Sequence, residues 1–384
     1  WESERDGFNR LYLYDLEGRL LRQISRGEVP VTQFYGFSAD GQYCFYQEAD
    51  ATAMNRHLVR APLYNRSLPT PLTRDQGVHH GLVSPSGDNL LDLYSNPNTP
   101  RIIRLISTKN ADAKKTIFEA PNPLADYKIG LTRLLAIPSP GGFTLNARMI
   151  LPPDFDAAKR YPAIVYVYNG PHVQLVNNAW LAGAEVWMHY MAQEGFVIFT
   201  LDGRGSAHRG RAFESAIYRR LGDAEIEDQL AGLAYLRDQP FIDPKRIGVY
   251  GWSYGGFMAT SLMTRPEVKG AFKCGVAGGP VIDWSMYEIM YTERYMDTPE
   301  QNPEGYRKSN LLNYVDNLDG RLLMIHGGAD DVVLWQHSLL YVRECVRKGK
   351  QFDYFVYPHH LHNVSVPERA HLFEKIERFF KENL

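Results

Sequence analysis

A serine lies in the pentapeptide GWSYG at residues 251–255, which has the G-x-S-x-G pattern of a nucleophile elbow. The apolar run at residues 246–250 predicts a buried strand before it, and the small residues at 256–263 predict a helix after it. A strand, a sharp turn and a helix in this order hold a serine hydroxyl exposed above a sheet. The flanking glycines let neighbouring backbone pack close to the bend. The pattern therefore predicts that Ser253 is a nucleophile, with an ordinary turn as the alternative.

An activated serine needs a general base, and the base needs a carboxylate that orients it. In α/β-hydrolases the acid follows the serine along the chain and the histidine follows the acid. The apolar run at residues 321–326 predicts a strand, and Asp330 is the first acid after the glycines that end it. Asp330 is therefore the predicted orienting carboxylate. Asp331 is its rival, with a solvated loop or helix-cap residue as its alternative role.

Three histidines, His359, His360 and His362, follow the next predicted strand at residues 352–357. His362 is the predicted base, because it lies farthest into the loop before the last helix. Taken singly, each of the three is equally compatible with a surface position. A zinc site is another interpretation, but neither a His-x-x-x-His pair on a helix nor a cysteine pair supports it. No metal and no cofactor is predicted.

The same chemistry needs hydrogen-bond donors for the oxyanion of the tetrahedral intermediate. The backbone N–H of Tyr254, directly after the nucleophile, is the first predicted donor. The second is expected from the loop after an earlier strand, and residues 163–168 read as such a strand, followed by Asn-Gly-Pro. The triple-glycine loop of lipases is absent there. Tyr168 is a candidate to donate through its hydroxyl, and the alternative is a tyrosine that only packs at the end of the strand.

The composition is sufficient for a large hydrophobic core, and the chain has no strong excess of either charge. The 384 residues are 44% hydrophobic, with a formal net charge of −2, which suffices for one large core and part of another. The near-neutral balance gives no reason to expect nucleic acid or an anionic membrane as a partner. No run of eighteen apolar residues occurs, so no membrane span is predicted. Three scattered cysteines are too few for a disulfide framework.

The first third of the chain contains a repeat. Its predicted strands at residues 10–14, 56–60 and 101–105 begin with arginines that lie 46 and 45 residues apart. Matching turns at residues 37–41 and 83–87 are again 46 residues apart. This period, with several short strands per unit, is typical of β-propeller blades. A propeller closes with roughly four to eight blades, so we expect these to be the last two to three, with earlier blades upstream of this chain.

A proline-containing linker at residues 119–124 separates this repeat from a different pattern. From about residue 126, predicted strands alternate with amphipathic helices, which indicates a mostly parallel sheet covered on both faces. The predicted fold is a partial β-propeller at residues 1–125, followed by a doubly wound α/β-hydrolase domain at residues 126–384. Besides the segments above, the prediction includes a strand at 196–201 and helices at 225–236, 336–348 and 366–380.

Propeller strands followed by a hydrolase domain with GWSYGG at residues 251–256 resemble the prolyl oligopeptidase family of serine peptidases, and specifically its dipeptidyl peptidase IV branch. The resemblance implies a triad of Ser253, Asp330 and His362. It also implies that Tyr168 donates to the oxyanion, since the family uses the tyrosine of its Tyr-x-Gly-Pro loop in this way. The stretches most similar to bacterial prolyl tripeptidyl peptidases are 276–284, 291–295, 333–338 and 362–364.

In this family, the proline before the cleaved bond occupies an aromatic-walled pocket. A flat pyrrolidine ring packs well on aromatic faces and makes little polar demand. The spacing of Trp284, Tyr287 and Tyr291 would put them on one face of a helix, although each could be an ordinary core aromatic. The positions that match the pocket are Tyr254, Val281, Trp284, Tyr287, Tyr291 and Val333.

The resemblance also bears on the length of the peptide that is released from the substrate's amino terminus. Glu288 matches a glutamate with which tripeptidyl enzymes bind the substrate's amino terminus, and its alternative role is a helix-surface acid. Dipeptidyl enzymes carry an asparagine two residues after the catalytic aspartate, whereas this chain has Val332, as the tripeptidyl enzymes do. The resemblance therefore favours release of Xaa-Xaa-Pro tripeptides over Xaa-Pro dipeptides.

The expected partners are peptides with proline at P1 and a free amino terminus. Members of this branch are commonly dimeric and usually extracytoplasmic, which implies a homodimer in the periplasm or at the cell surface. A binding scaffold that has lost hydrolysis is a competing hypothesis, but all three triad positions are filled. An esterase or acylaminoacyl peptidase is another, and the aromatic positions argue against it.

Overall fold

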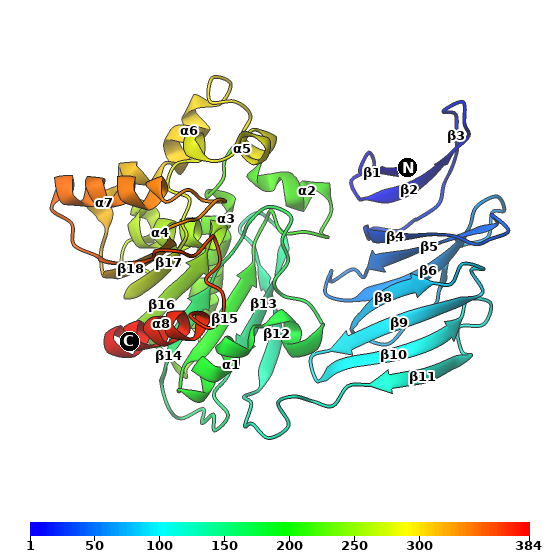
Figure 1. Cartoon of the computed structure of the whole chain (residues 1–384), viewed down its shortest axis with the longest axis horizontal. Coiled ribbons are helices and arrows are strands. Elements are labelled where there is room, and N and C mark those ends of the chain that lie inside the picture. The colour runs from blue at the N-terminus through cyan, green and yellow to red at the C-terminus, as the bar shows by residue number, and fades with distance from the viewer. The chain divides into compact units, whose positions relative to one another are not determined.

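The structure is a computed structural model that describes residues 1–384. It contains two compact units, here called the β unit and the α/β unit (Figure 1). The boundary predicted between residues 125 and 126 stays a prediction. The β unit consists of Trp1–Tyr127, Gln174–Glu185 and Ser206–Glu214, and the α/β unit of Lys128–Val173, Val186–Gly205 and Ser215–Leu384.

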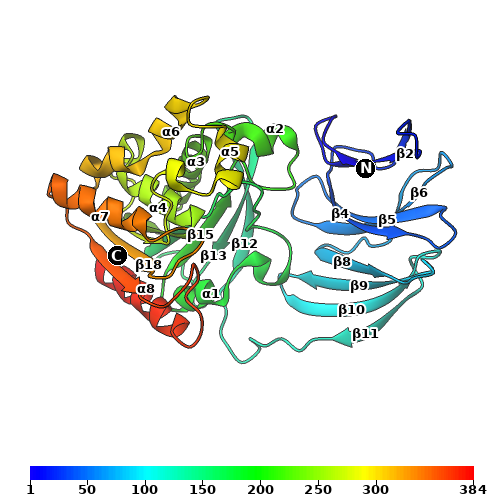
Figure 2. The ribbon, with the colours of Figure 1, turned by 45° about the horizontal axis from the view of Figure 1, so that its top comes forward.

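The β unit is built from antiparallel strands, which lie side by side in Figure 2. Strands β1 to β3 form one small sheet. Strands β4 to β7 and β8 to β11 form two further groups, joined by a single parallel pairing of Arg56 with Val78. The strands are β1 (Glu2–Ser3), β2 (Arg10–Tyr14), β3 (Leu20–Gln23), β4 (Val31–Phe37), β5 (Tyr43–Ala49), β6 (Arg56–Pro62), β7 (Thr70–Pro71), β8 (Val78–Val83), β9 (Asn89–Asn96), β10 (Thr99–Ser107) and β11 (Lys114–Glu119).

The predicted repeat of short strands is confirmed by this arrangement. The arginines of the repeat lie in β2, β6 and β10, and β6 and β10 are each the third strand of a group of four. The turn at residues 37–41 joins β4 to β5, and the turn at 83–87 joins β8 to β9. Equivalent turns therefore open equivalent hairpins, as expected of successive blades.

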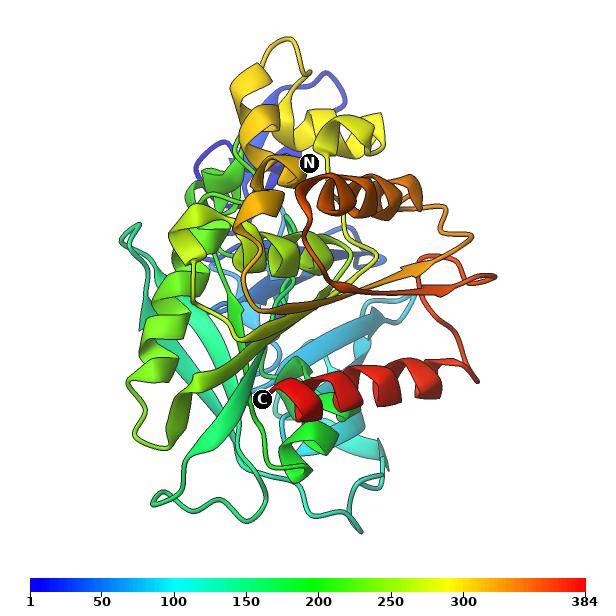
Figure 3. The same cartoon turned by 90° about the vertical axis from the view of Figure 1, so that its left-hand side faces the viewer.

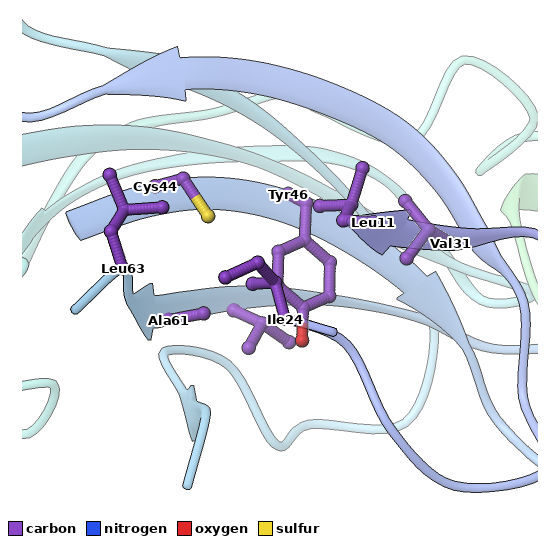
Figure 4. Close-up of a cluster of buried hydrophobic side chains, with 8 residues drawn as sticks. Leu11, Ile24, Val31, Cys44, Tyr46, Ala61 and Leu63 are labelled. Carbon is purple, nitrogen blue, oxygen red and sulfur yellow. The ribbon is translucent and has the colours of Figure 1, made fainter. Parts of the chain in front are cut away.

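Strand β5 of the β unit is buried on both faces. Cys44 and Tyr46 of β5 point into one apolar cluster, with Leu11 of β2 and Ile24 (Figure 4). Phe45, between them in sequence, belongs to a second cluster. Alternate side chains of a strand point to opposite faces, so β5 packs against side chains on both sides. The first cluster contains Leu11, Ile24, Val31, Cys44, Tyr46, Val59, Ala61 and Leu63, and the second contains Phe45, Leu58, Leu72, Leu90 and Ile106.

Two later segments of the chain also pack within the β unit, which the sequence patterns did not indicate. The Asn178 side chain donates a hydrogen bond to Oδ1 of Asn55 at 2.7 Å. The backbone N–H of Arg211 donates to the carbonyl of Gly7 at 2.8 Å. Their short helices are η1 (Trp180–Gly183) and α2 (Arg211–Glu214).

The α/β unit is built on one eight-stranded sheet with the order β12-β13-β15-β14-β16-β17-β18-β19. The pairings of β13 with its two neighbours are antiparallel, and all the others are parallel. The predicted doubly wound, mostly parallel sheet is therefore confirmed. Its strands are β12 (Thr132–Pro138), β13 (Thr144–Ile150), β14 (Tyr161–Tyr166), β15 (Val197–Asp202), β16 (Ile242–Trp252), β17 (Cys274–Gly278), β18 (Arg321–Gly327) and β19 (Asp353–Tyr357).

Helices cover both faces of this sheet. Figure 3 shows α8 on the face opposite to α4 and α7. Trp187 of α1 stacks on Phe373 of α8, with ring centroids 5.4 Å apart, so these two helices share a face. None of the helices is both long and apolar enough to cross a membrane. The helices of this unit are α1 (Val186–Gln193), η2 (Ser215–Ile217), α3 (Ala224–Arg237), α4 (Tyr254–Thr264), η3 (Pro266–Val268), η4 (Trp284–Met286), α5 (Ile289–Met296), α6 (Pro303–Ser309), η5 (Leu311–Asn317), α7 (Gln336–Lys348) and α8 (Arg369–Asn383).

A buried histidine–aspartate contact in the β unit yields a first prediction. Nδ1 of His79 lies 2.8 Å from Oδ1 of Asp92, and both side chains are fully buried. Replacing Asp92 by Ala leaves Nδ1 of the buried imidazole without its hydrogen-bond partner, so we expect the free energy of unfolding to fall by about 1–3 kcal/mol. Urea unfolding of the purified protein measures this. The exposed Asp112→Ala change is the control and should stay within about 0.5 kcal/mol of the parent. Equal stability of both variants would contradict the prediction.

Candidate active site

Ser253 lies at a sharp bend between a strand and a helix. Strand β16 ends at Trp252, and α4 begins at Tyr254. Ser253 itself has φ 62° and ψ −120°, a left-handed conformation that is strained for a residue with a side chain. Its backbone N–H donates to the carbonyl of Gly278 on the neighbouring strand at 2.8 Å. This is the geometry expected of a nucleophile elbow.

The glycines around Ser253 are required by close backbone approach. A Cβ atom on Gly255 would overlap the carbonyl oxygen of Val167, and one on Gly251 would overlap the carbonyl of Gly255. A Cβ atom on Gly256 would overlap the carbonyl of Gly278. The backbone of the elbow therefore packs closely against the ends of β14 and β17.

Asp330 and His362 are brought together by two loops that follow adjacent strands. Asp330 comes after β18, and His362 comes after β19. Nδ1 of His362 lies 2.8 Å from Oδ2 of Asp330. A carboxylate only accepts hydrogen bonds, so Nδ1 carries a hydrogen, and in the neutral imidazole the lone pair is then on Nε2. Asp331, the rival acid, is exposed.

The Asp330 carboxylate is fully buried, and both of its oxygen atoms have hydrogen-bond donors. Oδ1 accepts the backbone N–H groups of Val332 and Val333, each at 2.9 Å. Burial alone would raise the pKa of Asp330, but hydrogen bonds from His326 and His362 outweigh it and hold that pKa well below its ordinary value. Asp330 is therefore anionic and suited to orient an imidazole.

His326 is a partner of Asp330 that the sequence patterns did not indicate. Its Nε2 lies 3.3 Å from Oδ2 of Asp330 and 2.8 Å from the carbonyl of Val333. Its Nδ1 lies 2.7 Å from Oγ of Ser338 at the start of α7. The ring is fully buried. The only available signal was its place at the end of β18, four residues before the acid.

The end of β17 connects the serine to the Asp330–His362 pair. A Cβ atom on Gly279 would lie 3.2 Å from Cε1 of His362 and 3.5 Å from Oδ2 of Asp330. The preceding Gly278 carbonyl accepts from the backbone of Ser253. In addition, Nε1 of Trp252 donates to the carbonyl of His362 at 2.9 Å. The three predicted triad residues thus share one edge of the sheet.

Tyr168 reaches the same edge from the loop after β14. Burial raises the pKa of Tyr168 above its ordinary value, and the nearby Ser253 side chain offsets only part of that rise. The phenol is therefore neutral near pH 7 and able to donate. Its ring centroid lies 6.2 Å from that of Tyr254, the residue whose backbone N–H is the other predicted donor.

The predicted pocket aromatics form one cluster, but not on a single helix. Trp284 lies in η4, whereas α5 begins only at Ile289, so the helical spacing predicted for these rings was wrong. The extended residues Tyr287 and Glu288 interrupt the helical conformation there. The rings nevertheless meet: Trp284 lies 5.3 Å from Tyr254, 5.5 Å from Tyr287 and 5.9 Å from Tyr291, measured between centroids.

The remaining predicted residues border this cluster. Val281 and Val333 are buried, with 1% and 0% of their surface exposed. Burial raises the pKa of Tyr287, and the charges of Glu288 and Asp330 raise it further. Glu288 is exposed and precedes α5 without capping it through its side chain.

Two known sequence families match the chain. The model described as "Prolyl oligopeptidase family" matches residues 185–384. The model described as "Dipeptidyl peptidase IV (DPP IV) N-terminal region" matches residues 1–101. The first match falls on the α/β unit, except for residue 185 and the short segment 206–214, and the second falls on the β unit.

Individual relatives resemble the chain over nearly its whole length. Human dipeptidyl peptidase 8 is 34% identical over 355 residues, which cover 88% of this chain and 39% of that protein. Dipeptidyl peptidase 4 of Trichophyton tonsurans is 32% identical over 365 residues, covering 91% of this chain and 46% of that protein. The chain therefore spans less than half the length of these curated relatives.

Two solved structures superpose on the whole chain. A Bacteroides ovatus protein assigned as a dipeptidyl aminopeptidase IV is 41% identical, with a TM-score of 0.95, and 57% of that chain is covered. Porphyromonas gingivalis dipeptidyl peptidase 4 is 33% identical, with a TM-score of 0.92, and 54% of that chain is covered.

The packing of the elbow yields a second prediction. A methyl group on Gly255 has no room beside the Val167 carbonyl, so Gly255→Ala should lower the free energy of unfolding by about 1–3 kcal/mol. Urea unfolding with a fluorescence signal measures this. The comparison variant is Gly142→Ala, where the added methyl meets open space and only the φ of +81° opposes an alanine. A smaller loss for Gly255→Ala than for Gly142→Ala would show that the elbow is not tightly packed.

Proposed function

The chain belongs to the prolyl oligopeptidase family, in its dipeptidyl peptidase IV branch, and from that premise we propose that the protein is a serine exopeptidase that cuts after proline near a free amino terminus. The observation that carries the proposal is the hydrogen bond between His362 and the buried Asp330, at the sheet edge that also holds Ser253.

In the proposed reaction, Oγ of Ser253 attacks the carbonyl carbon of the proline residue while Nε2 of His362 takes its proton. Asp330 holds the imidazole in the required tautomer and stabilises the imidazolium. The phenol of Tyr168 and the backbone N–H of Tyr254 donate to the oxyanion. His362 then returns the proton to the leaving amine, which leaves an acyl-enzyme on Ser253. Water, deprotonated by His362, releases the peptide acid.

We further propose that the aromatic cluster receives the proline ring. Trp284 and Tyr291 are nearly parallel, at 10°, and Tyr287 meets both edge-on. These rings supply apolar contact area, and Val281 and Val333 add small apolar side chains beside them. A pyrrolidine ring gains burial there without requiring a polar partner.

The length of the released peptide is the finer part of the proposal. Val332 is 45% exposed and carries no polar side-chain atom to bind a substrate carbonyl. We propose that the protein releases Xaa-Xaa-Pro tripeptides, with Glu288 binding the ammonium group through a charge-assisted hydrogen bond. Release of Xaa-Pro dipeptides is the second candidate, because the similar proteins are named dipeptidyl peptidases. An extracytoplasmic location and a homodimer are further proposals from family resemblance.

The length of the released peptide is tested by comparing substrates of two lengths on the full-length protein. We expect kcat/KM for free Ala-Ala-Pro chromogenic amide to exceed that for free Gly-Pro amide, and blocking the amino terminus to abolish cleavage of both. Preference for Gly-Pro would favour the dipeptidyl candidate. Equal cleavage of blocked substrates would contradict exopeptidase action.

The variant Ser253→Ala is the control for this assay. Without the nucleophile, kcat should fall by on the order of 10⁶, and a fluorophosphonate probe should no longer label the protein. An unlabelled parent protein would instead favour an inactive binding scaffold.

The proposed oxyanion donor is tested by removing one oxygen atom. Tyr168→Phe keeps the ring but loses the hydroxyl, so we expect kcat to fall about 10²–10³-fold with little change in KM. The matched control is Tyr166→Phe, on the strand that leads into the same loop. A wild-type rate for Tyr168→Phe would refute the role.

A further inference from the structure

Helix α3 buries polar side chains where an amphipathic helix usually buries apolar ones. Glu225 is 0% exposed and Gln229 is 2% exposed. They are four residues apart and therefore neighbours on one helical face. Buried polar groups of this kind need hydrogen-bond partners, because an unpaired one costs about 1–3 kcal/mol. Each has one partner at the candidate active site: Tyr254 for Glu225 and Asn169 for Gln229.

Glu225 holds the side chain of the residue that follows the nucleophile. Its Oε1 accepts from the Tyr254 hydroxyl at 2.6 Å, and its Oε2 accepts from the backbone N–H of Gly222 at 3.0 Å. Burial raises the pKa of Glu225 to about 7, despite these two donors. The carboxylate sits in the first turn of α3, where the helix dipole favours a negative charge. Tyr254 is thus fixed at both its backbone, in α4, and its phenol.

Gln229 holds the loop that carries the other oxyanion donor. Its Nε2 donates to Oδ1 of Asn169 at 2.8 Å and to the carbonyl of Leu201 at 3.1 Å. Asn169 directly follows Tyr168 and has a left-handed φ of 59°, a conformation in which its position depends on surrounding contacts. The amide of Gln229 therefore links the Tyr168 loop to the end of β15.

We infer that Glu225 and Gln229 are positioning residues that set the separation between the Tyr168 hydroxyl and the Tyr254 backbone N–H. The two donors follow different strands, β14 and β16, and α3 is hydrogen-bonded to the Tyr254 side chain and to Asn169, the neighbour of Tyr168. Neither positioning residue touches substrate in this assignment. The inference rests on the proposed function, because it concerns the oxyanion of that reaction.

The test replaces each side chain with one of similar volume, Gln229→Met and Glu225→Gln. Gln229→Met removes the donor to Asn169, and Glu225→Gln replaces one of the two acceptor oxygens, which serve Tyr254 and Gly222, with an amide nitrogen. We expect kcat to fall about 10–100-fold in each variant, with KM changed less than about threefold, because a misplaced donor impairs the transition state more than substrate binding. Glu227→Gln, an exposed position on the same helix, is the matched control and should keep the parent kcat.

Two inhibitors separate positioning from a merely structural role. A peptidyl-proline boronate forms a tetrahedral adduct on Ser253 and needs the oxyanion donors, whereas an aminoacyl pyrrolidide binds without them. Boronate affinity should fall in parallel with kcat while pyrrolidide affinity stays unchanged. Equal weakening of both inhibitors, or a lower melting temperature with unchanged kcat, would overturn the inference. If one variant does not fold by circular dichroism, the other carries the test.

The wild-type protein in the same series separates the two hypotheses. If it does not cleave proline amides, the proposed function fails and the positioning inference fails with it. If it cleaves them in a Ser253-dependent manner and both variants keep its kcat, only the positioning inference fails.

Discussion

The buried carboxylate of Asp330 imposes the main constraint on this end of the α/β unit. A charged group removed from water is stable only when its lone pairs are filled by donors. Asp330 receives N–H groups from its own loop and from two imidazoles, one on β18 and one beyond β19. The chain after β19 must therefore return across the end of β18. Gly327 and Gly328 permit this return, because a side chain on either would overlap carbonyl groups of the returning loop or approach them too closely.

The strand order then brings the remaining groups to the same place. Strands β14, β16, β17, β18 and β19 are adjacent and parallel, so their carboxyl ends form one continuous edge. Ligands of open α/β sheets bind at such an edge. Along it the chain places Tyr168, Ser253, the spacer Gly279, Asp330 and His362, each after a different strand. Residues from distant parts of the sequence thus meet without any long excursion of the chain.

Local patterns were sufficient for the parts of this arrangement that depend on neighbouring residues. The elbow around Ser253, the two loops after β18 and β19, and the repeat in the β unit could all be predicted from motif, order and spacing. The pocket aromatics were misjudged, because helical spacing says nothing about the extended residues that separate η4 from α5. His326 was missed for a different reason. A histidine at the end of a strand has no local mark of its partner, which the fold supplies from a loop.

Helix α3 extends this point from single residues to a whole element. Its apolar residues recur with helical spacing and predicted its location correctly, whereas Glu225, Asp228 and Gln229 on the same helix are equally buried. Apolar side chains of similar volume at such positions are often neutral or stabilising, so the stability of the fold does not by itself require these polar groups. What distinguishes Glu225 and Gln229 is the position of their partners, since Tyr254 and Asn169 lie at the edge of the sheet that holds Ser253. Glu225 and Gln229 are therefore better explained by the geometry they impose on that edge than by the packing they provide.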